Sequence, residues 1–300
     1  MCGALLAVCL ASIFVGSVYV PPGEMAQSQI IISIRLPRIL LAVLVGILLS
    51  TSGVILQGVL RNPLADPYIL GVSAGAGAGA ALALAFNWSG VPLFAFLAAL
   101  IAVLVVYRLS QVASRTSAET LILAGVAVSA FASALLALII LTTGQLQAIY
   151  FWLLGSFSLA AYSDVLMLIP YAVIGLLISY FYSKELNALL LGEEVAKTLG
   201  VEVDKIRLFM IIVATLMAAA AVSVSGLIGF VGLIVPHFVR LWLGPNYRAL
   251  VPLSALSGAI LLVAADMLAR TALNPVEIPI GIVMSLVGAP FFIYLLRRRA

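Results

Sequence analysis

Long apolar runs alternate with short polar stretches along the whole 300-residue chain. A helix that crosses a bilayer needs about 17–25 mainly apolar residues. By this measure the pattern predicts ten membrane-spanning helices, at 3–20, 36–60, 69–86, 91–109, 118–141, 162–182, 206–225, 227–243, 249–269 and 279–296. We therefore expect an all-α, polytopic membrane protein that forms a single transmembrane domain over residues 1–300.

Composition supports this interpretation, because 65% of the residues are hydrophobic and only 9% are charged, against about 25% charged in soluble domains. Ten spans put both termini on one side of the membrane. Only three basic residues, Arg35, Arg38 and Arg270, then fall on the opposite side. Basic residues favour the cytoplasm, so the sequence predicts a multi-pass protein of the plasma (inner) membrane with both termini cytoplasmic. The twelve basic residues on the cytoplasmic side are Arg61, Arg108, Arg115, Lys184, Lys197, Lys205, Arg207, Arg240, Arg248, Arg297, Arg298 and Arg299.

The stretch 184–207 is the most polar part of the chain and holds nine of its 26 charged residues. It predicts two short helices broken at Gly192, the second with acidic residues in its first turn and Gly200 at its end. Such a segment cannot lie in lipid. It either folds against a partner or the membrane face, or it is a solvated loop with no partner.

The three basic residues on the other side also have two interpretations. Asp266 lies four residues before Arg270, which is the spacing of an ordinary helical ion pair, and long basic side chains near span ends often reach for the interface. Alternatively, Arg35, Arg38 and Arg270 form a positive outer rim that receives an acidic partner or ligand.

The glycine- and alanine-rich run 71–80 suggests three kinds of site. Gly71-x-Ser73-x-Gly75 resembles a nucleophile elbow, and with His237 as base it would make the chain an intramembrane serine protease. Gly75-x-Gly77-x-x-Ala80 resembles a dinucleotide fingerprint. Both motifs need a preceding strand, which the sequence does not predict. The third interpretation is a helix whose small residues let neighbouring helices approach closely. The small residues of the span at 118–141 are equally consistent with close packing or with lining a path.

Metal and cofactor chemistry has little support in the sequence. The chain has one histidine, His237, and two cysteines, Cys2 and Cys9, which do not form a zinc-ligand pattern. We expect no metal site and no cofactor in this chain.

Ion-coupled transport normally needs charged residues inside the membrane, but Asp66, Asp164, Asp266 and Glu277 all fall at or near span ends. A secondary transporter built from two inverted five-span halves remains an alternative. The chain has no GxxxxGK[ST] phosphate loop. Energy therefore has to come from a partner, which would also explain the charged stretch 184–207.

Several stretches together resemble one family, the FecCD-type permease subunits of type II ABC importers for iron-siderophores, haem and cobalamin. The resemblance covers nearly the whole chain in the family's order. Its motifs are Arg35-Leu36-Pro37-Arg38, the stretch 62–67 with Leu70-Gly71-Val72-Ser73, Leu191-Gly192-Glu193-Glu194 through Leu199-Gly200, the stretch 229–237, Leu268-Ala269-Arg270 and the stretch 277–281.

This resemblance implies a type II permease fold and a homodimer that is bound to two ABC ATPase subunits. A periplasmic or lipid-anchored binding protein would deliver the substrate, and nucleic acid has no role. The ATPases would bind ATP and Mg, so ATP hydrolysis would not occur in this chain. The cargo would be a metal chelate or a related metal-containing anion such as molybdate, which the sequence does not specify.

The resemblance also assigns residues. Arg35, Arg38 and Arg270 would dock acidic residues of the binding protein. The segment 186–200 would couple to the ATPase, through Leu189, Leu190, Gly192, Glu193, Glu194, Ala196, Leu199 and Gly200. The spans at 118–141 and 279–296 would line most of the path, with Ala130, Phe131, Ala134, Ile280 and Met284 as the predicted lining residues.

Overall fold

The computed structural model describes residues 1–16, 28–112, 115–116 and 118–299. Within these ranges each of the ten predicted spans contains one apolar helix, although positions 17–20 of the first span lie outside the described residues. Six segments are long and apolar enough to cross a membrane: Ile31–Val59 (η2 and α2), α4 (Val91–Ser110), α5 (Ala118–Thr143), α7 (Tyr162–Phe181), α10 (Val203–Ser225) and α12 (Tyr247–Thr271). Four shorter apolar segments complete the set: α1 (Cys2–Phe14), α3 (Val72–Ala85), α11 (Val231–Leu243) and the part Ile280–Ile293 of α13 (Ile280–Arg299).

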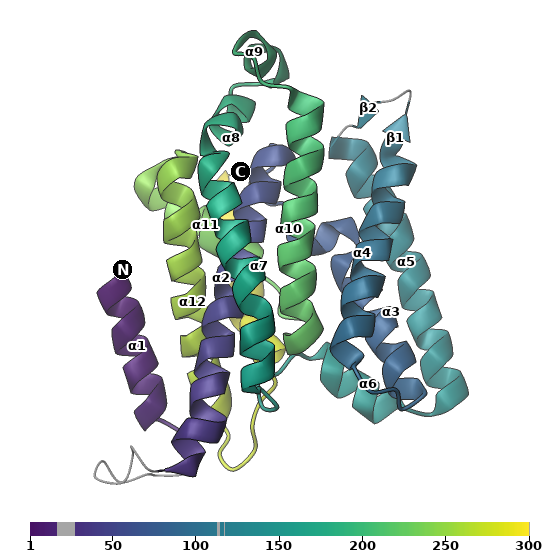
Figure 1. Ribbon diagram of the computed structural model, residues 1–300, viewed down its shortest axis with the longest axis vertical. Helices are drawn as coiled ribbons and strands as arrows, with labels where there is room; N and C mark the ends of the chain where they lie inside the picture. Colours follow the sequence, from purple (N-terminus) through teal and green to yellow (C-terminus); the bar gives the residue numbers. More distant parts are fainter. Residues whose placement is uncertain (17–27, 113–114, 117, 300) are drawn as a thin grey trace.

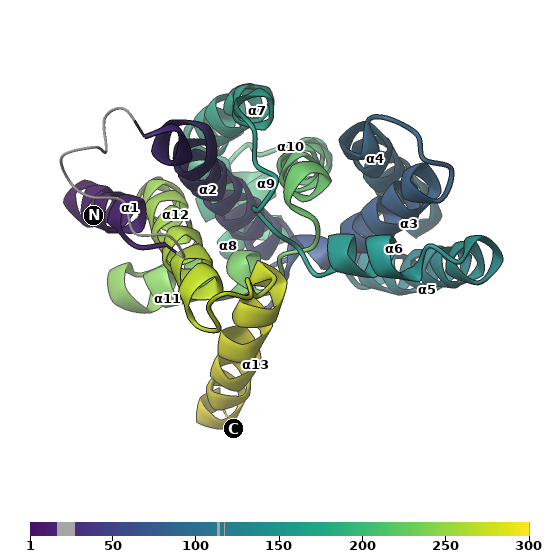
Figure 2. The ribbon, with the colours of Figure 1, turned by 90° about the horizontal axis from the view of Figure 1, so that it is seen from below.

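Helix α2 (Leu36–Val59) lies at the centre of the helical bundle. It packs against α12, α10, α7 and α11, and these helices surround it in Figures 1 and 2. In the most apolar window of the η2–α2 segment 78% of the residues are buried, compared with 17% in α5. The core of the molecule therefore follows α2, and α5 lies at its margin.

Glycine lets the central helices approach closely. A Cβ placed on Gly53 of α2 would lie 1.9 Å from the carbonyl oxygen of Gly232 in α11, and one on Gly46 would lie 2.4 Å from that of Gly258 in α12. The glycine–alanine run behaves in the same way, because Gly75 and Gly79 of α3 face the α4 backbone at similar distance. This confirms the close-packing interpretation of the run 71–80.

Helices α3, α4, α5 and the short α6 (Leu146–Leu153) form a second group beside α10 (Figure 1). The turn at Gly226, with φ +68°, separates α10 from α11, which confirms the boundary between the seventh and eighth predicted spans.

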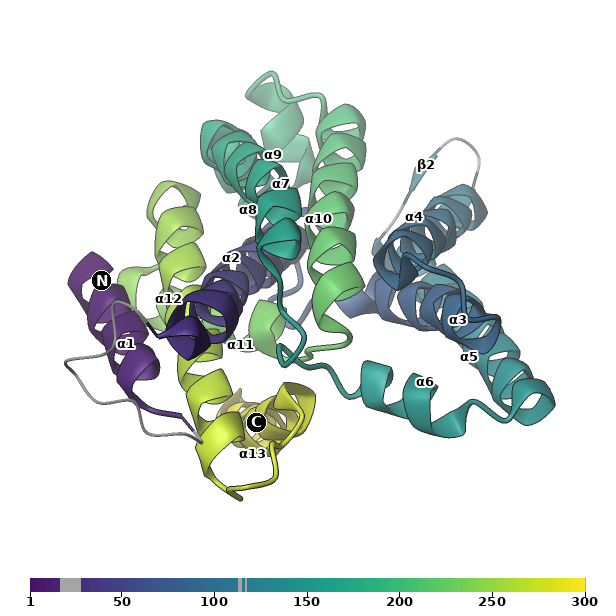
Figure 3. The same cartoon turned by 60° about the horizontal axis from the view of Figure 1, so that its bottom comes forward.

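The two ends of the molecule differ. One end, here called the α9 end, holds α8 (Ser183–Leu190), α9 (Glu193–Thr198) and the small hairpin of β1 (Gln111–Val112) and β2 (Arg115–Thr116). The opposite end, here called the α6 end, holds α6, the π-helical turn η2 (Ile31–Arg35) and the connection between α12 and α13 (Figures 1 and 3). The hairpin, two residues per strand, was not predicted from the sequence.

Candidate functional sites at the two ends

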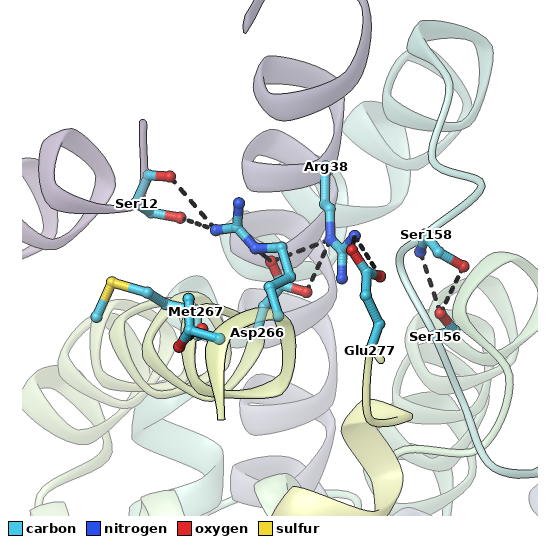
Figure 4. Close-up of polar contacts among 9 residues, drawn as sticks. Ser12, Arg38, Ser156, Ser158, Asp266, Met267 and Glu277 are labelled. Carbon is cyan, nitrogen blue, oxygen red and sulfur yellow. Dashed lines mark hydrogen bonds and ion pairs between the residues drawn. The ribbon is translucent and has the colours of Figure 1, made fainter. Parts of the chain in front are cut away.

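At the α6 end, Arg38 in the first turn of α2 is held by two carboxylates that are distant in sequence. Its Nε lies 2.9 Å from Oδ1 of Asp266, in α12, and its Nη1 lies 2.9 Å from Oε2 of Glu277, in the connection to α13. Figure 4 shows Arg38 between these two acids. Arg38 is 5% exposed, and a buried guanidinium is stable only when it is paired in this way.

The other two arginines reach the carbonyl end of α1. Arg270 lies 3.0 Å from Oδ2 of Asp266, which confirms the predicted i,i+4 pair, and its Nη2 donates to the hydroxyl of Ser12 at 2.6 Å. Arg35 donates to the carbonyl oxygen of Ile13. Helix α1 has no basic residue in its own last turn, so these arginines place positive charge at its negative dipole end.

Arg35, Arg38, Asp266, Arg270 and Glu277 therefore form one ionic group, which we call the arginine cluster. The three arginines are only 4–5% exposed, whereas the side chain of Glu277 is 36% exposed. The sequence indicated the Asp266–Arg270 pair by its spacing. It gave no signal for the pairing of Arg38 with acids more than 200 residues away.

At the α9 end, the stretch between α7 and α10 folds as two short helices, as predicted. Gly192, with φ +108°, separates α8 from α9, and Gly200, with φ +84°, follows α9. Glu193 fixes this pair of helices to the bundle: its Oε1 accepts from Arg61, at the end of α2, at 3.2 Å and from Arg207 in α10. We call residues 183–200 the α8–α9 knob.

The predicted coupling residues of the knob have different environments. Leu189 and Ala196 are buried inside the chain, Gly192 and Glu193 are half-buried, and Leu190, Glu194, Leu199 and Gly200 are exposed. Two further exposed apolar side chains of the knob, Leu191 and Val195, were not among the predicted coupling residues. Both could have been recognised in the sequence, because they are large apolar residues within a charged loop.

The predicted path residues also divide into two groups. Ala130, Phe131 and Ala134 of α5 are exposed. Ile280 and Met284 of α13 are 1% exposed and pack into the core, while the exposed face of α13 carries Leu286 and Val287.

The connection between α2 and α3 holds a capping carboxylate. Asp66 accepts the backbone N–H of Tyr68 at 2.9 Å and caps η3 (Pro67–Leu70), a 3-10 turn. Burial raises the pKa of the Asp66 carboxyl to about 6, although the hydrogen bond from Tyr68 opposes the shift.

The serine-protease motif lacks its structural context. The 3-10 turn η3, and no strand, comes before Ser73, which lies in the first turn of α3. His237 lies in α11 and is buried. Among the described residues, no group of three or more His, Cys, Asp or Glu side chains could hold a metal ion.

Comparison with known proteins gives one consistent result. The model of the FecCD transport family matches residues 4–298. The chain is 46% identical to the cobalamin import system permease protein BtuC of Halobacterium salinarum, over 92% of this chain and 76% of the relative. It is 40% identical to the hemin transport system permease protein HmuU of Yersinia pestis, over 91% and 85%. A solved structure described as an inward-facing conformation of a transporter assigned to the metal-chelate ABC type superposes with a TM-score of 0.91 at 36% identity, covering 99% of this chain and 97% of that one.

The fold and these similarities define the class of protein, the transport permease subunits of ABC importers, which are not enzymes. The chain belongs to the FecCD transport family. This membership overturns the serine-protease alternative.

Proposed function

We propose that this permease carries a metal chelate, such as an iron–siderophore complex, haem or cobalamin, or a related metal-containing anion, from a periplasmic or extracellular binding protein into the cytoplasm. The names of its cobalamin and hemin relatives support this class of cargo. The structural observation that carries the proposal is the exposed apolar surface of the α8–α9 knob.

This surface is unusual for a segment that faces water. Leu191 is 65% exposed and Leu199 is 62% exposed, and Val195 lies between them in sequence. Exposed apolar side chains that gather on a polar loop mark a surface that a partner covers. The partner would be an ABC ATPase subunit, which contacts Leu190, Leu191, Glu194, Val195, Leu199 and Gly200, and the α9 end would face the cytoplasm.

The remaining predicted coupling residues would transmit the movement. Leu189 and Ala196 anchor the knob in the core, and Gly192 and Gly200 supply its turns. Glu193 connects the knob to α2 and α10 through Arg61 and Arg207. A shift from mostly inward-facing to mostly outward-facing permease requires about 5 kcal/mol of differential binding. ATP and Mg bound by the ATPases would supply it.

At the opposite end, the arginine cluster would receive acidic residues of the binding protein through Arg35, Arg38 and Arg270. Three arginines against Asp266 and Glu277 leave one net positive charge. Because the arginines are nearly buried, docking would have to displace the half-exposed Glu277 from Arg38.

The permease would act as a homodimer. Helix α5 is mostly exposed, and α13 carries the exposed Leu286 and Val287. A second copy would cover part of these surfaces. The cargo would pass along Ala130, Phe131 and Ala134, with Ile280 and Met284 supporting the α13 wall from behind.

The test is co-expression of the permease with its cognate ABC ATPase. The double variant Leu191→Glu/Leu199→Glu should lose ATPase co-purification and ATP-dependent uptake into liposomes, because two charges would have to be buried in the interface. Lys197→Gln, an exposed position of the same knob within α9, is the matched control and should keep both. Uptake by the permease alone, driven by an ion gradient without ATP, would refute the proposal and favour a secondary transporter.

A further inference from the structure

A large cavity with no role assigned above lies between α4 and α10. Its volume is about 640 Å³, within the range of about 300–1,000 Å³ that is typical of small-molecule sites. Leucine, isoleucine and valine side chains of the two helices line most of it, and Tyr107, Arg108 and Gln111 lie at the end where α4 finishes. We call it the α4–α10 groove.

A second, smaller hollow of about 330 Å³ lies between α7 and α10. Leu216 lines both cavities, so together they make a branched apolar surface on α10. Seen from below, α4, α10 and α7 lie on one side of the molecule, and α5 and α13 lie on the other (Figure 2). The groove is therefore on the face opposite the surfaces assigned above to the dimer and the path.

Two polar groups in the groove, Arg108 and Thr215, have no partner among the residues that the structure describes. Arg108 is exposed in the last turn of α4, and among the described residues no acidic side chain forms an ion pair with it. Thr215 is 4% exposed, lines the groove, and its Oγ1 has no hydrogen-bond partner within the part of the chain that the structure describes. An unpaired hydroxyl in apolar surroundings costs free energy, so a bound molecule that accepts its hydrogen bond would be stabilised.

We propose that the α4–α10 groove binds an anionic glycerophospholipid from the leaflet at the α9 end. Arg108 and Gln111 contact the phosphate, Thr215 donates its hydroxyl to an ester carbonyl, and the acyl chains follow the apolar walls on either side of Leu216. Basic residues at the membrane end of an interhelical pocket are suited to anionic headgroups.

The chemistry of the groove favours a lipid over other ligands. An aqueous metabolite would leave most of the apolar wall uncovered. A single protein helix would fill one arm of the cavity and leave the branch at Leu216 empty. Contact of Arg108 with the general headgroup layer would account for its charge, but it would leave the Thr215 hydroxyl unsatisfied.

The experiment measures lipid retention by the purified permease with native mass spectrometry, in detergent doped with dioleoyl phosphatidylglycerol or dioleoyl phosphatidylcholine. The wild type should retain phosphatidylglycerol preferentially. Arg108→Gln should reduce that preference about fivefold, the effect expected for one basic residue at an anionic surface. Lys184→Gln, an exposed lysine at the same end, is the matched control and should leave the preference unchanged.

Two further variants separate a built site from surface charge. Thr215→Val keeps the side-chain shape and should weaken retention of both lipids, because it removes the donor to the ester. Leu216→Trp should block the branch and abolish retention of both. Equal retention of the two lipids by the wild type, an unchanged preference in Arg108→Gln, or full retention in Leu216→Trp would each overturn the proposal. None of these readouts depends on the cargo or the ATPase.

Discussion

Arg38 shows how one residue can join parts of the chain that are far apart in sequence. Its guanidinium contacts the last third of α12 through Asp266 and the following connection through Glu277. Breaking such a buried pair by removing one partner typically costs about 3–5 kcal/mol, because a buried charge is left uncompensated. Asp266, which also holds Arg270, is therefore the residue on which the arginine cluster most depends.

Asp66 should make the stability of the permease depend on pH. Its pKa in the folded protein is raised to about 6, above the value near 3.9 of an unfolded chain, so the folded state favours the protonated acid. Its stabilising contribution is complete below about pH 4 and is lost as the pH rises through about 6. Asp66→Asn keeps the oxygen that caps η3 and should raise the melting temperature in detergent by a few degrees at pH 7.5.

At pH 4.5 the difference in melting temperature should be much smaller, because the wild-type acid is then largely protonated in the folded protein. An equal difference at both pH values would show that titration of Asp66 is not the cause.

At the scale of helices, the contact of α2 with α11 depends on glycine. Gly53→Ala would place a methyl group 1.9 Å from the Gly232 carbonyl oxygen, so one of the helices would have to move. Forcing an extra methyl group into a packed core usually costs about 1–3 kcal/mol of folding free energy. The cost here should lie at the upper end of that range, because the contacted atoms belong to the backbone, which cannot rotate aside as a side chain can. We expect a clearly lower melting temperature, or aggregation during size-exclusion chromatography.

Gly229→Ala provides the control, because no atom lies within 4 Å of the Cβ that it adds. If both variants behave like the wild type, the close approach of α2 and α11 is not required for the fold.

The helices could be predicted from the sequence because span length and glycine spacing are local properties. Within the described ranges each predicted span contains a helix, and Gly192 and Gly200 mark the turns of the knob. The face that α13 turns toward the core could not be predicted. Its membrane-spanning part is apolar on all sides, so packing alone decides that Met284 is buried and Leu286 is exposed. The partners of Arg38 were hidden for a similar reason, because pairing between distant spans leaves no local pattern.

At the scale of the whole molecule, the two functional ends are connected through shared helices. Helix α2 begins at the arginine cluster and ends beside Arg61, which holds Glu193 of the knob. A binding protein that contacts Arg38 and an ATPase that moves the knob would therefore both act on helix α2. In the proposed docking, Glu277, the most exposed member of the cluster, would be the first group that a binding protein meets.

Glu277→Gln should strengthen docking of the binding protein several-fold at low salt. The substitution removes one of the two carboxylates that hold Arg38 and raises the net charge of the cluster from one to two, while Asp266 still keeps the guanidinium paired. Charge at an exposed rim acts mainly on association rate and salt dependence, so the gain should shrink as ionic strength rises. Biolayer interferometry at two salt concentrations measures both quantities.

Asp164→Asn is the matched control, because Asp164 lies in the first turn of α7 and accepts only from the backbone N–H of Ala161 among the described residues. The same charge change there should leave docking nearly unaltered. Asp266→Asn should instead destabilise the permease itself, since it leaves Arg38 and Arg270 facing each other without their shared acid. Weaker docking by Glu277→Gln would mean that Glu277 itself contacts the binding protein, and the arginines would then not be the groups exposed for docking.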